Sequence, residues 1–218
     1  MKRYNTIIFD LDGTIADTSE GIYNCIRFVQ EKLRLPAITS EQMRSHIGPP
    51  MQESYARNFG LSGAQLDEAV SYHKEYALTK GLYEATLYPG IPTLLQSLSD
   101  EGCRLAMATL KFEETARKML DYLKVSSYFH AICGTLSQIK LTKAQLLAKS
   151  IERCKSSKSN ALLIGDSSYD AIGAHQAGID FLGVTYGFGF KSKADVDEYP
   201  NVGCAERISD ILTQINEE

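Results

Sequence analysis

Short apolar runs recur along the chain, and each is followed by residues that are typical of turns. Most of these runs are continuous rather than alternating between apolar and polar positions. Continuous runs are expected of strands that are buried on both faces of a parallel sheet. The strands predicted in this way are Thr6–Phe9, Arg104–Ala108, His130–Cys133, Ala161–Ile164 and Phe181–Val184.

Helical patterns separate the later four of these strands. Glu113–Lys124 and Lys143–Cys154 repeat their apolar residues every three or four positions, and Ala171–Ala177 follows the fourth strand. Strands that alternate with helices favour the α/β class, because each crossover helix returns the chain to the same edge of the sheet. The pattern therefore predicts a doubly wound parallel sheet of Rossmann-like type.

A long stretch with helical periodicity interrupts this alternation. Residues 10–103 separate the first strand from the second, far more than a crossover helix needs. Ser19–Leu33 is strongly amphipathic, with Ser19 as its predicted N-cap. Further helices are predicted over Ser40–His46, Met51–Phe59, Ala64–Thr79 and Ile91–Leu98. We therefore expect an α/β core of residues 1–15 and 85–218, with a helical domain inserted at residues 16–84.

The most chemically distinctive segment is Phe9-Asp10-Leu11-Asp12-Gly13-Thr14, directly after the first strand. This position lies at the carboxyl edge of the sheet, where α/β folds bind ligands. Gly13 permits a sharp turn, so the carboxylates of Asp10 and Asp12 can approach one site. Two carboxylates so close repel one another, and a divalent cation would relieve the repulsion. A turn with two solvated acids is the alternative, but the complete pattern after a buried strand favours a functional site.

The six-residue segment resembles the first motif, DxDGT, of the haloacid dehalogenase-like (HAD) hydrolase superfamily. That family places three further motifs at the ends of later strands. Thr109 resembles the second motif, Lys143 the basic third, and Gly165-Asp166-Ser167-Ser168-Tyr169-Asp170 the acidic fourth. The motifs occur in the family's order and cover essentially the whole chain, which makes their joint occurrence more specific than any one of them.

Each of the later motif residues also has a purely structural interpretation. Thr109 could be an ordinary threonine at the end of a strand. Lys143 could be a solvated helix residue, as most lysines are, and Lys140 is its rival for the basic role. Asp166 and Asp170 could simply cap the helix predicted over Tyr169–Ala177.

The resemblance implies a magnesium-dependent phosphatase that forms an aspartyl-phosphate. Asp10 would be the nucleophile and Asp12 the general acid and base, with a pKa raised well above its free value. The Mg²⁺ ligands would be Asp10, the backbone carbonyl of Asp12, and Asp166, with Asp170 mainly behind them. The phosphate would be bound by Thr109, Lys143, Gly13 and Lys111.

A helical insertion after the first motif resembles the family's type-1 cap, a lid with hinges near Ala16–Ser19 and Tyr83–Tyr88. Gly48-Pro49-Pro50 and Gly183–Gly189 resemble the phosphoglycolate phosphatase-like branch. Leu110-Lys111-Phe112 departs from the Ser-Lys-Pro that is more frequent in that branch, which leaves the substrate open. The resemblance implies a small phosphorylated metabolite, such as a phosphoglycolate-like ester or a nucleoside monophosphate.

Two other functions fit the same motifs. A phosphosugar mutase of the β-phosphoglucomutase type would share Asp10 and Asp12 but would return the phosphoryl group to a sugar. A non-catalytic module that binds Mg²⁺ or a phospho-ligand belongs to a different class, but every catalytic position is filled in this chain. Release of inorganic phosphate would separate the hydrolase from both.

Composition and charge narrow the range of partners. The chain is 44% hydrophobic and 23% charged, as in ordinary globular proteins. Its 23 basic and 27 acidic residues give a net charge of −4, which argues against a nucleic acid polymer as partner. Five scattered cysteines are typical of reduced thiols, and the apolar runs are too short for a signal peptide or a membrane span. We expect a cytoplasmic monomer or homodimer with no membrane partner.

Overall fold

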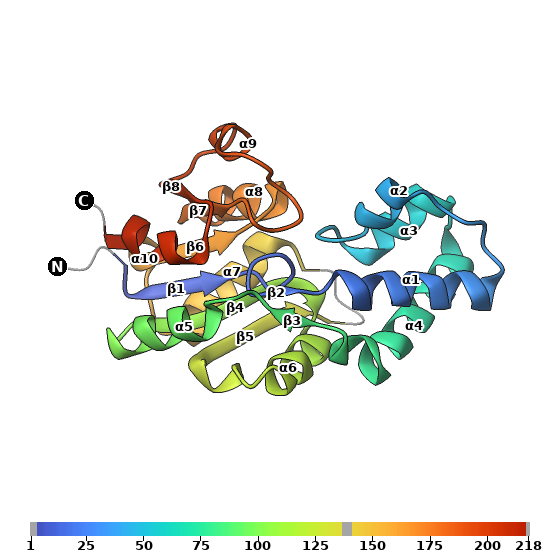
Figure 1. Cartoon of the computed structure of the whole chain (residues 1–218), viewed down its shortest axis with the longest axis horizontal. Coiled ribbons are helices and arrows are strands. Elements are labelled where there is room, and N and C mark those ends of the chain that lie inside the picture. Colours follow the sequence, from blue (N-terminus) through green and yellow to red (C-terminus); the bar gives the residue numbers. More distant parts are fainter. Residues whose placement is uncertain (1–3, 137–140, 217–218) are drawn as a thin grey trace.

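The structure, a computed structural model, describes residues 4–136 and 141–216 of the 218-residue chain. Its centre is a six-stranded sheet in the order β5-β4-β1-β6-β7-β8, and all neighbouring strands in it are parallel (Figure 1). The strands are β1 Thr6–Phe9, β4 Arg104–Phe112, β5 Phe129–Thr135, β6 Ala161–Gly165, β7 Asp180–Val184 and β8 Gly203–Ala205. The predicted doubly wound α/β class is therefore confirmed, and the strand order reverses beside β1.

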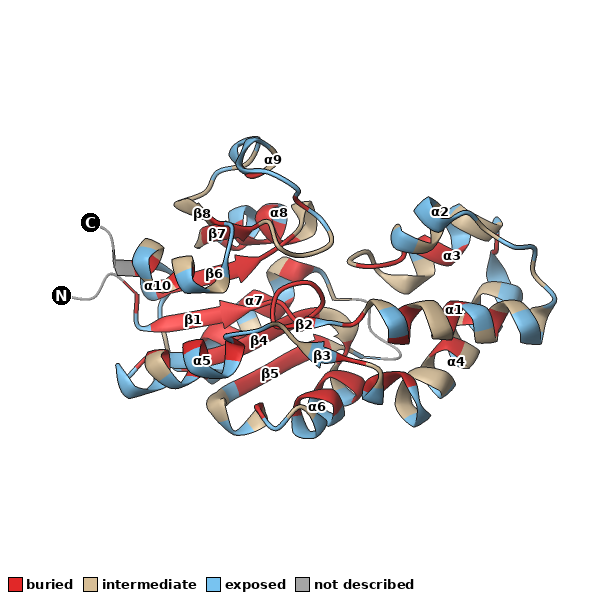
Figure 2. Cartoon of the chain, in the orientation of Figure 1, coloured by how far each residue is buried: buried red, intermediate tan, exposed pale blue. Residues whose placement is uncertain are grey.

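Helices cover both faces of the sheet, which explains why the strands lack alternation (Figure 2). Ile7 and Phe9 of β1 pack in one apolar cluster with α5, α6 and α10, whereas Ile8 packs in another with α7, α8 and α9. The helices are α5 Ile91–Asp100, α6 Glu113–Tyr122, α7 Lys143–Arg153, α8 Ser168–Ala177, α9 Lys193–Asp197 and α10 Ile208–Asn216. Short 3₁₀ turns lie at Ser126–Tyr128 and Lys158–Asn160.

A group of helices lies beyond the carboxyl ends of the strands (Figure 1). This helical segment contains α1 Ser19–Leu33, α2 Ser40–Arg44, α3 Met51–Phe59 and α4 Gly63–Thr79. It has an apolar cluster of its own, in which Val29, Tyr55, Leu61 and Ala69 are buried. Among the described residues, no helix is both long and apolar enough to cross a membrane.

The two connections to the helical segment lie side by side. Ala16–Asp17 (β2) leads into the segment, Thr86–Leu87 (β3) leads out of it, and the two form an antiparallel ribbon. A 3₁₀ turn, Gly81–Tyr83, precedes β3. Because both connections are short and hydrogen-bonded to each other, the helical segment is held over the loop that follows β1.

Most predicted elements begin and end within two residues of the bounds that the sequence indicates, but some differ further. The helix over Ser19–Leu33 is confirmed, yet its N-cap is Thr18 and not Ser19. The strand predicted to end at Ala108 continues to Phe112, and its register with β5 is broken between these two residues. The strand extends past Thr109 because Phe112 pairs again with Thr135 of β5.

Other differences lie near the ends of elements. The helix predicted over Ser40–His46 ends at Arg44, because the N–H groups of His46 and Ile47 bond to carbonyls three residues back, as in a turn. Strand β8 and helices α9 and α10 were not predicted from the apolar pattern. Lys140, the rival for the basic role, lies outside the described residues.

Candidate active site

The loop after β1 turns so tightly that only a glycine fits at position 13. Gly13 has a φ of +86°, and a Cβ added to it would collide with the carboxylate of Asp166. Its N–H donates a hydrogen bond to the carbonyl of Ala16 at 2.9 Å, so this N–H is already engaged within the loop. Gly13 therefore lets the loop after β1 contact the loop after β6. The sequence predicts that Gly13 binds phosphate, but its N–H is not free to do so, because it already donates to Ala16.

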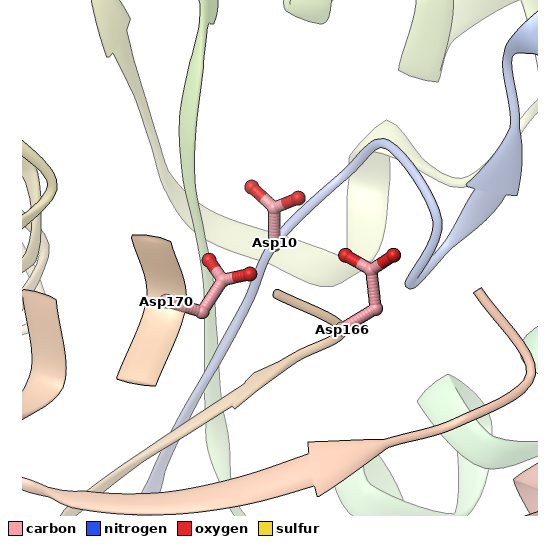
Figure 3. A group of neighbouring side chains, drawn as sticks. All are labelled: Asp10, Asp166 and Asp170. Atoms are coloured by element: carbon pink, nitrogen blue, oxygen red, sulfur yellow. The ribbon is translucent and has the colours of Figure 1, made fainter. Parts of the chain in front are cut away.

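Three buried carboxylates meet at the carboxyl edge of the sheet. Asp10 follows β1, Asp166 follows β6, and Asp170 lies in the first turn of α8. One oxygen of each lies within 4.8 Å of the others, and Figure 3 shows the three side chains gathered around a common space. Residues 156 positions apart in the chain are thus brought to one point by neighbouring parallel strands.

Lys143 places an ammonium group against this triad. Its Nζ lies 2.6 Å from Asp10 Oδ1, from Asp170 Oδ1 and from the carbonyl oxygen of Ala108. Lys143 is the first residue of α7 and is only 5% exposed, so it is not a solvated helix lysine. Its aliphatic stem passes Gly173 of α8, where a Cβ would collide with it.

A reciprocal pair of hydrogen bonds fixes the start of α7. Thr142 accepts from the N–H of Gln145, and the Gln145 side chain accepts from the N–H of Thr142. This capping box satisfies two backbone donors of the first turn and holds the helix end in place. Lys143 is consequently delivered to the triad by a fixed helix terminus.

Asp166 and Asp170 each use one oxygen for a structural contact. Asp166 Oδ2 accepts from the N–H groups of Phe188 at 2.7 Å and Gly189 at 3.0 Å. Asp170 Oδ2 accepts from the N–H of Ser167 at 3.1 Å and from its hydroxyl at 2.6 Å. Asp170 therefore does support the start of α8, but its other oxygen pairs with Lys143.

The triad carries more negative charge than Lys143 offsets. Burial raises the pKa of Asp10 far above its ordinary value; Lys143 lowers it, and the neighbouring carboxylates raise it further. Burial and Asp170 raise the pKa of Asp166 to about 7, although two backbone N–H groups oppose this. Burial lowers the pKa of Lys143, but the carboxylates of Asp10 and Asp170 have the larger combined effect and raise this pKa above its ordinary value. Crowded, buried oxygen donors with raised pKa values fit a hard divalent cation, so this acidic triad could bind a metal.

Asp12 makes its side-chain contacts away from the triad. Its carboxylate accepts a hydrogen bond from the hydroxyl of Thr18 at 2.6 Å and lies 3.2 Å from Nζ of Lys111. Thr109 is buried beside it, and its hydroxyl accepts from the N–H of Lys111. One small cavity is lined by Asp10, Asp12, Thr109, Lys143 and Asp170. Five of the residues predicted from the sequence therefore converge on this cavity. Lys111, which was predicted to bind phosphate, places its ammonium against Asp12.

A model of the haloacid dehalogenase-like hydrolase family matches residues 7–184. The chain belongs to this family. The match begins in β1 and ends with β7, so it includes Asp10, Thr109, Lys143 and Asp166.

Relatives of this haloacid dehalogenase-like hydrolase are similar over nearly its full length. The chain is 32% identical to a 5′-nucleotidase from Pseudomonas aeruginosa, over 94% of this chain and 92% of that protein. It is 28% identical to a phosphoglycolate phosphatase from Caulobacter vibrioides, over 84% of this chain and 80% of that one. A solved haloacid dehalogenase-like family hydrolase from Streptococcus pneumoniae superposes with a TM-score of 0.88 at 33% identity, covering 98% and 99% of the two chains. The chain is therefore an enzyme, a phosphoric monoester hydrolase of the HAD family.

Some residues that complete the site of this HAD hydrolase were not singled out from the sequence. Thr18 hydrogen-bonds Asp12 from the N-cap of α1, and the N–H groups of Phe188 and Gly189 bind Asp166. Gly173 makes room for the Lys143 stem. The two glycines at 187 and 189 are a sequence signal for the backbone contacts to Asp166, because a Cβ at either position would collide with the loop that carries Asp166.

Proposed function

We propose that the chain is a magnesium-dependent phosphatase that hydrolyses small phosphate monoesters through a phosphorylated Asp10. The observation that carries this proposal is the meeting of Asp10, Asp166 and Asp170 with Lys143 at the edge of the sheet. Asp10, Asp166, Asp170 and the backbone carbonyl of Asp12 would hold Mg²⁺, whose oxygen preference matches this donor set. When bound, the ion supplies positive charge that offsets the phosphate and the carboxylates.

The reaction has two displacements at phosphorus. In the first, a carboxylate oxygen of Asp10 forms a bond to phosphorus while the ester P–O bond breaks, and Asp12 gives a proton to the leaving alkoxide. In the second, an oxygen of water forms a bond to phosphorus while the bond between phosphorus and the Asp10 oxygen breaks, and Asp12 takes up a proton from the water. The products are an alcohol, inorganic phosphate and free Asp10.

Lys143 and Thr109 are proposed to bind the transferring phosphoryl group. Both line the cavity that also holds Asp10 and Asp12, and Lys143 brings the positive charge. Hydrogen-bond donors fixed beforehand around developing negative charge stabilise a transition state without further reorganisation. Lys111 supports the site less directly, because its ammonium lies 3.2 Å from the Asp12 carboxylate.

We further propose that residues 16–84 form a cap domain over a core of residues 1–15 and 85–218. Support comes from contacts that bridge the two parts. Phe188 of the core packs against the cap cluster that contains Ile22 and Ile47. The hydroxyl of Tyr169 donates a hydrogen bond to Glu53 at 3.2 Å. A cap that closes in this way excludes water from the phosphorylated enzyme and limits the size of the substrate.

Release of inorganic phosphate tests the proposed function. The panel is phosphoglycolate, nucleoside monophosphates, hexose phosphates and pyrophosphate, each with Mg²⁺ and with a chelator. We expect phosphate from at least one monoester with Mg²⁺, and a loss of about 100-fold or more with the chelator. Conversion of a hexose phosphate to its isomer without phosphate release would support the mutase instead. No phosphate from any member of the panel would contradict hydrolysis.

The thermal stabilisation by Mg²⁺ should grow with pH. The folded, metal-free protein has an Asp166 pKa of about 7, above its ordinary value of 3.8. A carboxyl group whose pKa is raised on folding makes its full contribution to the stability of the fold below the pKa of the unfolded chain. For Asp166 this contribution is lost as the pH rises through about 7. Ionised carboxylates are also what Mg²⁺ binds. The melting temperature measured at about pH 5.5 and about pH 8 should therefore show a larger Mg²⁺ shift at the higher pH. Equal shifts at both would argue against a metal on Asp166, and Asp166→Asn should weaken the trend.

A further inference from the structure

A second small cavity lies between the cap and the core, next to Asp12. Its volume is about 50 Å³, and its polar lining comes from Asp12, His46, His73, Lys111 and Thr115. Asp12, Gly48 and Leu110 also line the cavity that holds Asp10 and Lys143, so the two spaces adjoin at Asp12. A group attached to a phosphate on Asp10 can therefore extend into this second space while it stays in contact with Asp12.

Two polar atoms on this cavity are buried without a hydrogen-bond partner among the described residues. They are Nε2 of His46 in the cap and the hydroxyl of Thr115 in the first turn of α6. The residues are only 6% and 2% exposed. A buried polar atom that makes no hydrogen bond is costly, and native proteins usually satisfy such atoms with a protein group, water or a ligand. Two of them from opposite walls of one cavity point to a polar molecule between cap and core.

The remaining polar groups of the cavity favour a ligand that accepts hydrogen bonds. Lys111 brings an ammonium to it. The cavity also lies beside the first turn of α6, a position that favours negative charge, although Glu113 and Glu114 already lie in that turn. His73 is held by a hydrogen bond between its Nδ1 and the hydroxyl of Tyr55 at 3.0 Å. Burial lowers the pKa of His46 to about 4 and that of His73 to about 3, so both imidazoles are neutral at pH 7 and each carries one N–H.

We propose that this cavity is the leaving-group site, that it takes a short leaving group ending in a carboxylate, and that Thr115 and His46 determine this specificity. The inference rests on the proposed phosphatase function and names its substrate class. Since one water needs about 10–15 Å³ of such volume, the cavity has room for roughly three to five non-hydrogen atoms. That number fits a hydroxy acid of two or three carbons and excludes a nucleoside.

A larger groove on the other side of the site is the competing location. It has a volume of about 360 Å³ and is mostly apolar, with Met51, Leu141 and Ile172 in its wall beside Lys143. Asp12 is absent from the described residues that line it. A leaving group in this groove would fit a nucleoside but would lie away from the acid that must protonate it. The contact with Asp12 therefore favours the smaller cavity.

Three phosphate esters and one conservative variant test this inference. The esters are phosphoglycolate, phosphoethanolamine, which has a similar length and a cationic end, and AMP. We expect the wild type to have its highest kcat/KM on phosphoglycolate. Thr115→Val keeps the shape of the side chain and removes the hydroxyl, and we expect it to lower kcat/KM on phosphoglycolate by roughly tenfold, mainly through KM. On phosphoethanolamine the same variant should change kcat/KM by less than about twofold, and Thr115→Ser should restore the wild-type value.

Ser54→Ala is the matched control. Its hydroxyl in α3 is also buried, with no hydrogen-bond partner in the part of the chain that the structure describes, and Ser54 does not line either of the two adjoining cavities. It should leave kcat/KM unchanged on all three esters. A wild-type preference for AMP, or an equal effect of Thr115→Val on all esters, would overturn the leaving-group assignment while phosphate release still supported the phosphatase. If no ester yields phosphate and Asp10 is not phosphorylated, the proposed function itself fails and this inference fails with it.

Discussion

An Asp10→Asn enzyme is expected to stay folded and to lose phosphatase turnover by on the order of 10⁴-fold or more. The amide is not a nucleophile toward phosphorus, so the aspartyl-phosphate cannot form. The fold should survive, because asparagine has the same shape and removes one charge from a crowded acidic triad. Repulsion from Asp170, Asp12 and Asp166 contributes to the raised pKa of Asp10, and the substitution relieves this repulsion.

The measurement is the rate of phosphate release with Mg²⁺, together with trapping of ³²P on the protein and the melting temperature without metal. Asp121→Asn, the same chemical change on an exposed position of α6, is the matched control and should keep the wild-type rate. If Asp10→Asn retained a rate within about tenfold of the wild type, or still trapped phosphate, another residue would have to be the nucleophile.

The parts of the site that lie on single strands and turns could be predicted from the sequence. Asp10 and Asp12 follow a strand whose four residues are all buried, and a continuous apolar run is a local signal of such a strand. Because the sheet is parallel, the carboxyl ends of β1, β4 and β6 lie at one edge. Loops at those ends therefore had to converge, whatever the details of packing.

The contacts between distant side chains could not be predicted in the same way. Thr115 has the pattern of an ordinary polar residue in the first turn of a helix, and nothing in its own segment indicates that it shares a cavity with His46 and His73. His46 belongs to none of the motifs in the sequence, yet it lines a cavity with Asp12. Thr18 lies only six residues from Asp12, but the sequence does not single it out, because Ser19 is an equally good N-cap by residue type. Nothing local to any of these residues reports what faces it across the site.

The end of the chain was missed for a different reason. Strand β8 is three residues long and holds Gly203 and Cys204 in partly exposed positions, so its apolar signal is weak. It is added at the edge of the sheet beside β7, where pairing through the backbone needs little apolar surface. Short edge strands are determined by the sheet that they join more than by their own sequence.

Lys143→Met is expected to destabilise the metal-free protein by about 3–5 kcal/mol at neutral pH, because it leaves two buried carboxylates without their cation. Asp10 Oδ1 and Asp170 Oδ1 both lie 2.6 Å from the ammonium. The pKa of Lys143 is raised above its ordinary value of 10.5, so its stabilising contribution is complete at neutral pH and is lost only at strongly alkaline pH. A loss of this size corresponds to a fall in melting temperature of roughly 10 °C in a chain of this length.

The same substitution should lower turnover by about 100- to 1,000-fold, since it removes a fixed positive charge from the site of the transferring phosphoryl group. Lys149→Met, on the same helix but away from the triad, is the control and should change neither quantity. Thermal unfolding without metal measures the role of Lys143 in stability separately from its role in turnover. Because burial raises the pKa of Asp10 well above its ordinary value, protonation of Asp10 removes part of the unpaired charge, and the stability deficit of Lys143→Met should shrink as the pH falls below neutral. A deficit that is independent of pH would mean that lost packing against Gly173, and not the unpaired carboxylates, explains the effect.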